Sequence, residues 1–201
     1  VVIIGGGVVG ENAIYMALGM AAKVTVLDRN VDVLRNLTTR FGPALTTVYS
    51  TQAALEQYVL EADLVIGGVL VKGAEAPKLV TADMVREMST GSVLCDVAID
   101  QGGCFETSKA TTHAEPTYIV DDVVHYCVAN MPGAVPHTST YALNNVTLPY
   151  TLALADKGYK QALSDNPMFM EGLNVHKGRV TYKAVAEDLG YEYLPAVEAL
   201  A

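Results

Sequence analysis

Short apolar runs rich in β-branched residues alternate with helical patterns through the first two thirds of the chain. The runs expected to form strands are 1–4, 23–28, 45–49, 63–69, 92–98, 117–120 and 124–128. The helices expected between them span residues 11–22, 31–41, 51–61 and 81–88, where apolar positions recur every three or four residues. Continuously apolar strands separated by helices are typical of parallel sheets covered on both faces. The pattern therefore predicts an α/β fold built on a doubly wound parallel sheet of the Rossmann type.

This alternation stops near residue 130. The elements expected beyond it are a helix over 138–155 with a kink at Pro149, a short helix over 159–163, a hairpin-like stretch over 175–181 and a helix that ends at Gly190. We therefore expect two parts. Residues 1–130 form a nucleotide-binding domain, and residues 131–201 form a helical C-terminal segment.

The most informative motif is a glycine-rich turn between the first predicted strand and the first predicted helix. It reads Gly5-Gly6-Gly7-Val8-Val9-Gly10. Gly5 permits a tight turn, Gly7 lets a pyrophosphate approach the backbone, and Gly10 lets the helix pack closely on the sheet. The amides at the helix start, those of Val8 and Val9 among them, point toward phosphates, whose charge the helix dipole favours. Strand, turn and helix in this order indicate a dinucleotide site, in preference to a glycine-rich turn that has no ligand.

An acidic residue ends the second predicted strand. Asp28 is placed to accept hydrogen bonds from an adenosine ribose, and its charge would repel the 2′-phosphate of NADP. The sequence therefore favours NAD as the cofactor. Two alternatives stay open: Asp28 as a simple turn or cap residue, and Arg29 as a contact to a 2′-phosphate.

Further candidates follow the fourth and fifth predicted strands, because ligands of such sheets bind beyond the carboxyl ends of the strands. Gly67 and Gly68 either leave room for a nicotinamide ribose or meet a packing requirement. Asp100 lies in an apolar, glycine-rich loop and is either an acid/base or ribose ligand or a turn residue. Cys104 has no activating neighbour in the sequence, so we expect an inert thiol.

Composition and charge narrow the class of protein. The 201 residues are 51% hydrophobic and 17% charged, and the net charge of −9 argues against nucleic acid or an anionic membrane as a partner. No segment reads as a transmembrane helix or signal peptide. The three cysteines lack metal-site or disulfide spacing, which favours a cytoplasmic location. The four histidines are also scattered, so we expect no metal site, and His125 on its predicted strand is expected to be structural.

The beginning of the chain is informative as well. Residue 1 is Val, and it already lies inside the first predicted strand. We therefore expect the sequence to be a piece of a longer protein.

Several long segments resemble bacterial alanine dehydrogenase, a family related to the NAD-binding subunit of proton-translocating transhydrogenase. These segments are 62–67, 76–80, 96–104, 126–136, 138–143 and 173–175. The likeness covers essentially all 201 residues. It implies a nucleotide domain followed by a C-terminal return into a substrate domain. The family's substrate-binding Arg, Lys and His belong to an N-terminal half that has no counterpart here.

The resemblance also implies roles for residues at matching positions. Asp100 corresponds to the catalytic aspartate, and Asp28 to the acid on the adenosine ribose. The other cofactor contacts that it implies are Ser50, Val69, Leu70 and Ile99, with Asn130 and Met131 lining the nicotinamide site. Val8 and Lys72 depart from the forms expected in the family, and neither touches the chemistry.

The implied reaction is the reversible oxidative deamination of L-alanine to pyruvate and ammonia with NAD, and the implied assembly is a homo-oligomer, a hexamer. The apolar stretch from Tyr141 to Leu154 carries few charges, which fits a face that packs on a neighbour. Two alternatives are the NAD-binding subunit of transhydrogenase and an NAD-binding module without catalytic activity. We expect the 201 residues alone to be inactive, because they lack a cationic clamp for the pyruvate carboxylate.

Overall fold

The computed structural model describes residues 1–69 and 77–201. Two compact units make up this part of the chain. The first contains the described residues up to Met131, and the second runs from Pro132 to Ala201.

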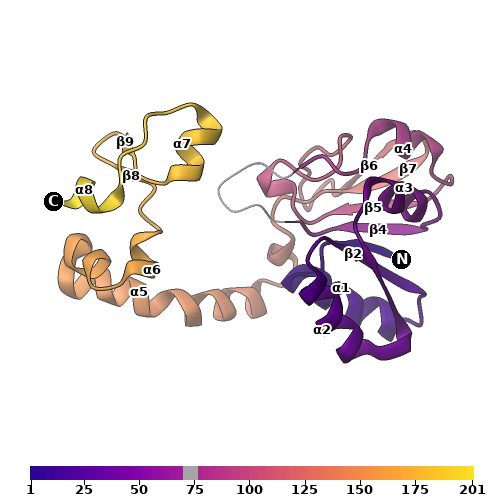
Figure 1. Ribbon diagram of the computed structural model, residues 1–201, viewed down its shortest axis with the longest axis horizontal. Helices are drawn as coiled ribbons and strands as arrows, with labels where there is room; N and C mark the ends of the chain where they lie inside the picture. Colours follow the sequence, from indigo (N-terminus) through magenta and orange to yellow (C-terminus); the bar gives the residue numbers. More distant parts are fainter. Residues whose placement is uncertain (70–76) are drawn as a thin grey trace. The chain divides into compact units, whose positions relative to one another are not determined.

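The first unit is built on a seven-stranded sheet with the order β3-β2-β1-β4-β5-β7-β6 (Figure 1). Its strands are β1 (Val2–Ile4), β2 (Val24–Asp28), β3 (Leu45–Tyr49), β4 (Leu64–Gly67), β5 (Val93–Asp96), β6 (Thr117–Val120) and β7 (Val123–Tyr126). The chain runs outward from β1 to β3 and then returns to place β4 on the other side of β1. The predicted doubly wound sheet is confirmed, and the strand order reverses between β1 and β4.

The sheet is not parallel throughout, and this part of the prediction was wrong. β6 pairs with β7 in antiparallel fashion. Asp121 and Asp122 join the two strands with φ angles of 49° and 61°. A two-residue turn in this left-handed conformation matches the twist of an antiparallel hairpin, and it is too short for a parallel crossover.

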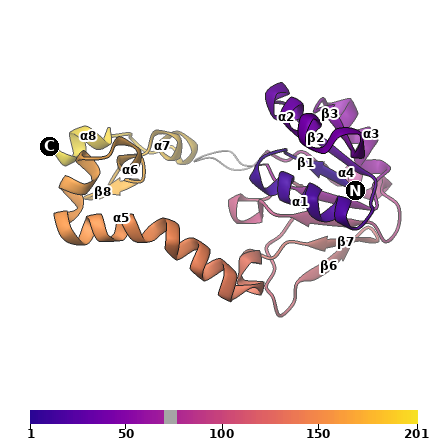
Figure 2. The same cartoon turned by 90° about the horizontal axis from the view of Figure 1, so that it is seen from below.

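Helices cover both faces of the sheet (Figures 1 and 2), and in Figure 2 the strands run from β3 near the top to β6 at the bottom. The helices are α1 (Val8–Gly19), α2 (Val31–Phe41), α3 (Gln52–Leu60) and α4 (Ala82–Glu87), with 3₁₀ turns η1 (Gly42–Ala44) and η2 (Ile99–Gln101). Ile3 packs in one core with α1 and α2, while Val2 and Ile4 pack in the other with α3 and α4. Successive strand residues point to opposite faces, so a single apolar run serves both cores.

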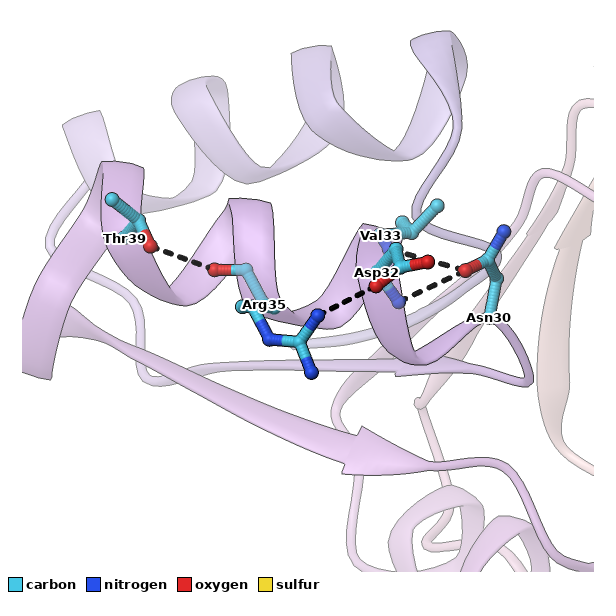
Figure 3. A network of polar contacts seen from close by, with 5 residues as sticks. All are labelled: Asn30, Asp32, Val33, Arg35 and Thr39. Atoms are coloured by element: carbon cyan, nitrogen blue, oxygen red, sulfur yellow. Dashed lines mark hydrogen bonds and ion pairs between the residues drawn. The ribbon is translucent and has the colours of Figure 1, made fainter.

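The start of α2 is held by a side-chain cap next to the candidate site (Figure 3). Asn30, a residue type favoured at helix N-caps, accepts hydrogen bonds from the amides of Asp32 (2.9 Å) and Val33 (3.4 Å). Arg35 pairs with Asp32 at 2.6 Å, and the Thr39 hydroxyl donates to the Arg35 carbonyl at 3.0 Å. A cap of this kind contributes about 1 kcal/mol. It therefore fixes where α2 begins, directly after Asp28 and Arg29.

The second unit is mostly helical. Its elements are α5 (Pro136–Ser164), α6 (Pro167–Met170), β8 (Val175–His176), β9 (Arg179–Val180), α7 (Lys183–Leu189) and α8 (Ala196–Leu200), preceded by the 3₁₀ turn η3 (Met131–Ala134). The expected hairpin is confirmed by the pairing of β8 with β9. None of the helices in the described ranges combines the length and hydropathy that crossing a bilayer requires.

The long helix of this unit differs from the prediction in one respect. Its helical dihedral angles are interrupted at Gly158 (φ 73°, ψ 158°) and not at Pro149. Glycine adopts a positive φ at no steric cost, so the interruption falls there. The predicted helices 138–155 and 159–163 lie on either side of it.

Candidate dinucleotide-binding site

A cavity of about 500 Å³ opens in the first unit at the carboxyl ends of β1 and β2, beside the point where the strand order reverses. It brings together seven of the residues predicted to bind the cofactor: Gly5, Gly7, Val8, Val9, Asp28, Ser50 and Val69. Of the other lining residues, the sequence offered Arg29 and Gly68 as alternatives, and it did not assign Ile4, Leu27, Pro77 or Leu79 to cofactor contact. Five of these six residues, all except Arg29, are apolar or glycine, which suits the flat faces of a nucleotide.

The turn between β1 and α1 depends on positions without side chains. Gly5 has a φ of +97°, and its amide donates to the Leu27 carbonyl at 2.8 Å. A Cβ placed on Gly10 would lie 1.9 Å from the Gly5 carbonyl oxygen. Gly10 therefore allows the close packing of α1 that the sequence predicted.

Gly7 is the exception within this turn, because a Cβ built there would meet nothing within 4 Å. Gly7 is also the N-cap of α1, and no side chain caps that helix. The first amides of a helix have no partner inside it, and Val8 and Val9, which carry two of them, line the cavity. The turn thus fits a phosphate group, which would accept hydrogen bonds from these amides.

Asp28 connects the two backbone segments that border the cavity. Its Oδ2 accepts a hydrogen bond from the Gly6 amide, and its Oδ1 accepts one from the Asn30 amide, both at 2.7 Å. Asp28 therefore does have the structural role in a turn that the sequence left open as an alternative. Each carboxylate oxygen keeps a further lone pair, so Asp28 also remains able to accept from ribose hydroxyls.

The two glycines after β4 have different surroundings. A Cβ on Gly67 would lie 2.2 Å from Cys104 Sγ and 2.8 Å from the Phe105 ring, so the packing alternative holds at this position. Gly68 lines the cavity, and a Cβ there would lie 3.0 Å from a Val9 methyl carbon.

Four other predicted cofactor residues, Ile99, Asp100, Asn130 and Met131, do not line this cavity. Asp100 lies exposed in η2, and Ile99 beside it is buried. Asn130 is exposed, and its carbonyl accepts from His113 Nε2 at 2.5 Å, while Met131 is half-buried. Leu70 lies outside the described residues. The structure therefore assembles the predicted residues of the adenosine and pyrophosphate side, and their binding role stays a prediction.

Sequence reasoning missed Asp96, the last residue of β5. Its side chain is fully buried and accepts five hydrogen bonds. The signal available in the sequence was an acid that ends an apolar strand in the middle of the sheet. Such a carboxylate is costly to bury unless several donors surround it.

The thiols and His125 behave as expected. Burial, together with the nearby Asp96, raises the pKa of the Cys104 thiol, which disfavours the reactive thiolate. Burial, with smaller effects from Cys127 and Asp96, raises the pKa of Cys95 to about 11. His125 Nδ1 donates to the Val123 carbonyl (3.0 Å), so neutral Nε2 accepts from the Thr107 hydroxyl (2.7 Å). His125 is therefore a structural histidine. In the described ranges no three acidic, histidine or cysteine side chains gather as metal ligands.

The fold and the cavity define a Rossmann-type nucleotide-binding domain. Residues 1–183 match the family described as "Alanine dehydrogenase/PNT, C-terminal domain". The chain belongs to this family, as its sequence suggested. The family and the fold together imply a nicotinamide nucleotide as the cofactor.

Individual proteins place the chain more closely within the family. Alanine dehydrogenase of Halomonas elongata is 63% identical over 200 residues, which cover 100% of this chain and 54% of that protein. A solved L-alanine dehydrogenase is 52% identical with a TM-score of 0.83, covering 94% of this chain and 52% of its own. A transhydrogenase from Sinorhizobium meliloti is more distant. It is 27% identical with a TM-score of 0.65, and the match covers 75% of this chain and 43% of that protein's chain. The chain spans about half the length of the curated relatives that it matches.

Proposed function

We propose that this chain is the NAD-binding half of an enzyme that deaminates L-alanine oxidatively and reversibly to pyruvate and ammonia. The observation that carries the proposal is the 63% identity to an alanine dehydrogenase along the whole chain, against 27% over 75% of the chain for a transhydrogenase. Residues 1–130 form the NAD-binding domain in this proposal. Residues 131–201 form a linking helix and part of a substrate domain.

The residues of the cavity would hold the cofactor in an extended form. The open space at Gly7 and the first amides of α1, including those of Val8 and Val9, would receive the pyrophosphate. Asp28 would bind the adenosine ribose, and Ser50 and Val69 line the same cavity. The remaining predicted contacts would follow on the nicotinamide side: Leu70, Ile99, Asn130 and Met131.

Asp100 would serve as an acid/base group. NAD, when bound, supplies the acceptor for a hydride from the substrate α-carbon. The protein must also move protons on and off the substrate nitrogen and oxygen, and an exposed carboxylate on a short turn is able to exchange them.

The test uses the full-length protein, with NADH formation from L-alanine as the readout. We expect L-alanine-dependent reduction of NAD by the full-length protein, and NADH binding without turnover by residues 1–201 alone. Hydride exchange between two nicotinamide nucleotides with no response to L-alanine would favour the transhydrogenase alternative. If residues 1–201 alone form NADH from L-alanine, and Asp100→Ala abolishes this, the substrate site lies within these residues and the proposed division is wrong.

A hexameric, cytoplasmic enzyme is part of the same proposal. In support, α5 carries large apolar side chains that are exposed: Tyr141, Leu143, Val146, Leu148, Tyr150 and Leu152. Such a surface is typical of helices that pack on a partner. The three cysteines are free thiols, as in a reducing compartment. Light scattering of the full-length protein at micromolar concentration should show a hexamer, and a monomer would contradict this part.

A further inference from the structure

The buried Asp96 carboxylate joins the two ends of the segment that carries Asp100. Its Oδ1 accepts from the Ala98 amide at 3.2 Å, ahead of Asp100 in the chain. Its Oδ2 accepts from the amides of Cys104 (2.9 Å) and Phe105 (3.3 Å), beyond Asp100. One side chain thus fixes the backbone on both sides of the η2 turn.

The turn itself folds tightly over this carboxylate. The Gln101 and Gly103 amides both donate to the Ala98 carbonyl, at 2.9 and 3.0 Å. Gly103 has a φ of +76°, and a Cβ there would lie 2.7 Å from Asp96 Oδ2. The Lys78 ammonium donates to the carbonyl of Gly103 at 2.9 Å and to that of Gly102. The backbone that presents Asp100 therefore has little freedom to move.

The donors around Asp96 are neutral groups. Besides the three amides, the Ser108 hydroxyl donates to Oδ2 at 2.5 Å and the Cys104 thiol to Oδ1 at 3.5 Å. None of the ion pairs in the described part of the chain includes Asp96. A buried carboxylate that has only neutral partners needs all of its hydrogen bonds. Each of them is charge-assisted, so the surrounding loop is held firmly.

We propose that Asp96 is a positioning residue that holds the Ile99–Gln101 turn so that the Asp100 carboxylate meets the substrate in a fixed geometry. This inference rests on the proposed function of Asp100. Proton transfer depends steeply on the distance and angle between donor and acceptor, whereas the dinucleotide cavity is lined by other loops. Loosening Asp96 should therefore slow turnover far more than it weakens cofactor binding, to which this turn contributes only the proposed contact of Ile99.

The test compares two hydroxyls in the full-length protein: that of half-buried Ser108, which bonds to the last residue of β5, and that of buried Ser92, which precedes β5. Ser108→Ala removes the 2.5 Å donor to Asp96. Ser92→Ala, the matched control, removes a hydroxyl that donates to the Ala62 carbonyl at 3.1 Å just before β5 begins. We expect Ser108→Ala to lower kcat about 10-fold or more. The KM for NAD and the Kd for NADH should stay within about 2-fold of the wild-type values.

Besides the control Ser92→Ala, three further variants sharpen the comparison: Ser108→Thr, Asp96→Asn and Cys104→Ala. Ser92→Ala should keep wild-type turnover, and Ser108→Thr, which retains a hydroxyl, should restore most of it. Asp96→Asn offers only one acceptor oxygen and should lower kcat more than Ser108→Ala and alter the pH profile of kcat. Cys104→Ala removes the thiol that donates to Asp96 Oδ1, together with the volume of a fully buried sulfur atom, and it provides a second comparison if Ser108→Ala does not fold.

The outcomes separate this inference from the proposed function. Turnover in Ser108→Ala equal to that of Ser92→Ala would overturn the positioning role. An equal loss of NADH affinity and turnover would also overturn it, because the effect would then be general loosening. A wild-type protein that forms no NADH from L-alanine would instead overturn the proposed function.

Discussion

The loop after β1 and the loop after β5, both at the carboxyl edge of the sheet, are stabilised in opposite ways. The loop after β1 depends on missing side chains, because a Cβ on Gly10 would lie 1.9 Å from the Gly5 carbonyl oxygen. The loop after β5 depends on one buried side chain, Asp96, which gathers donors from as far along the chain as Ser108. In the proposed function the loop after β1 receives a phosphate, and its helix α1 has no side-chain cap. The loop after β5 presents the Asp100 carboxylate in that proposal, and the amides on either side of Asp100 are bonded to Asp96.

The largest expected effect tests the loop after β5. In the full-length protein, Asp100→Asn should bind NADH normally and lose about 10²–10⁴-fold in kcat, because an amide keeps the shape but cannot take up a proton. Asp121→Asn makes the same change of charge in the β6–β7 turn, at the opposite edge of the sheet, and should keep full activity. Steady-state rates with L-alanine measure both. Near wild-type turnover in Asp100→Asn would make Asp100 a simple turn residue.

The next effect tests the loop after β1. Gly10→Ala should lower the free energy of unfolding by about 1–3 kcal/mol or more, because its methyl group collides with the backbone at Gly5. Gly7→Ala places the same methyl group in open space and should cost about 1 kcal/mol or less. The Gly7→Ala methyl would enter the space expected for the pyrophosphate, so NADH should bind more weakly. Urea unfolding and NADH titration measure the two effects, and equal stabilities would contradict the packing argument.

A comparable effect concerns Asp28, which holds the Gly6 amide of that loop, and the choice between NAD and NADP. NADP should bind several-fold to about 100-fold more weakly than NAD, since its 2′-phosphate would face the Asp28 carboxylate. Both carboxylate oxygens are held in place by the Gly6 and Asn30 amides, so Asp28 cannot easily turn away. Calorimetric titration with each nucleotide gives the ratio. Equal affinities would assign the phosphate to Arg29, which lines the same cavity.

The smallest effect is a pH dependence beneath the loop after β5, where Thr107 donates to His125. Burial lowers the pKa of His125 below its ordinary value of 6.5. Between that lowered pKa and 6.5, the unfolded chain binds a proton that the folded protein does not. The free energy of unfolding should therefore fall as the pH drops below 6.5, by at most about 1.4 kcal/mol per unit. His125→Gln should lose this part of the slope in urea unfolding at several pH values, and an unchanged slope would contradict the assignment.

Local signals explain why so much of the first unit could be predicted. The strands, the glycine turn and the Asn30 cap each depend on residues close together in the chain, and the structure contains all three. Two features follow from details that an apolar pattern does not carry. The antiparallel direction of β6 follows from the left-handed backbone of Asp121 and Asp122, and the role of Asp96 follows from donors spread over residues 98–108. Neither leaves a periodic pattern in the sequence.

In the second unit, the sequence predicted the wrong position for the break in the long helix α5. Both Pro149 and Gly158 interrupt a helical pattern, and the sequence alone favoured the proline. In the structure the helical dihedrals continue through Pro149 and break at Gly158. Proline costs a helix one hydrogen bond but keeps a helical φ, whereas glycine opens backbone conformations that other residues avoid.

The double attachment of Asp28 has a consequence for anyone who wishes to redesign cofactor preference in this domain. Exchange for a small neutral residue would remove the repulsion of a 2′-phosphate. It would also release the Gly6 and Asn30 amides, which belong to the phosphate turn and to the start of α2. Asn at this position would retain one acceptor oxygen, so a redesign by that route would give up less rigidity. In the proposed function, selectivity and scaffold share this one carboxylate, and an engineer must supply a substitute for the second role when altering the first.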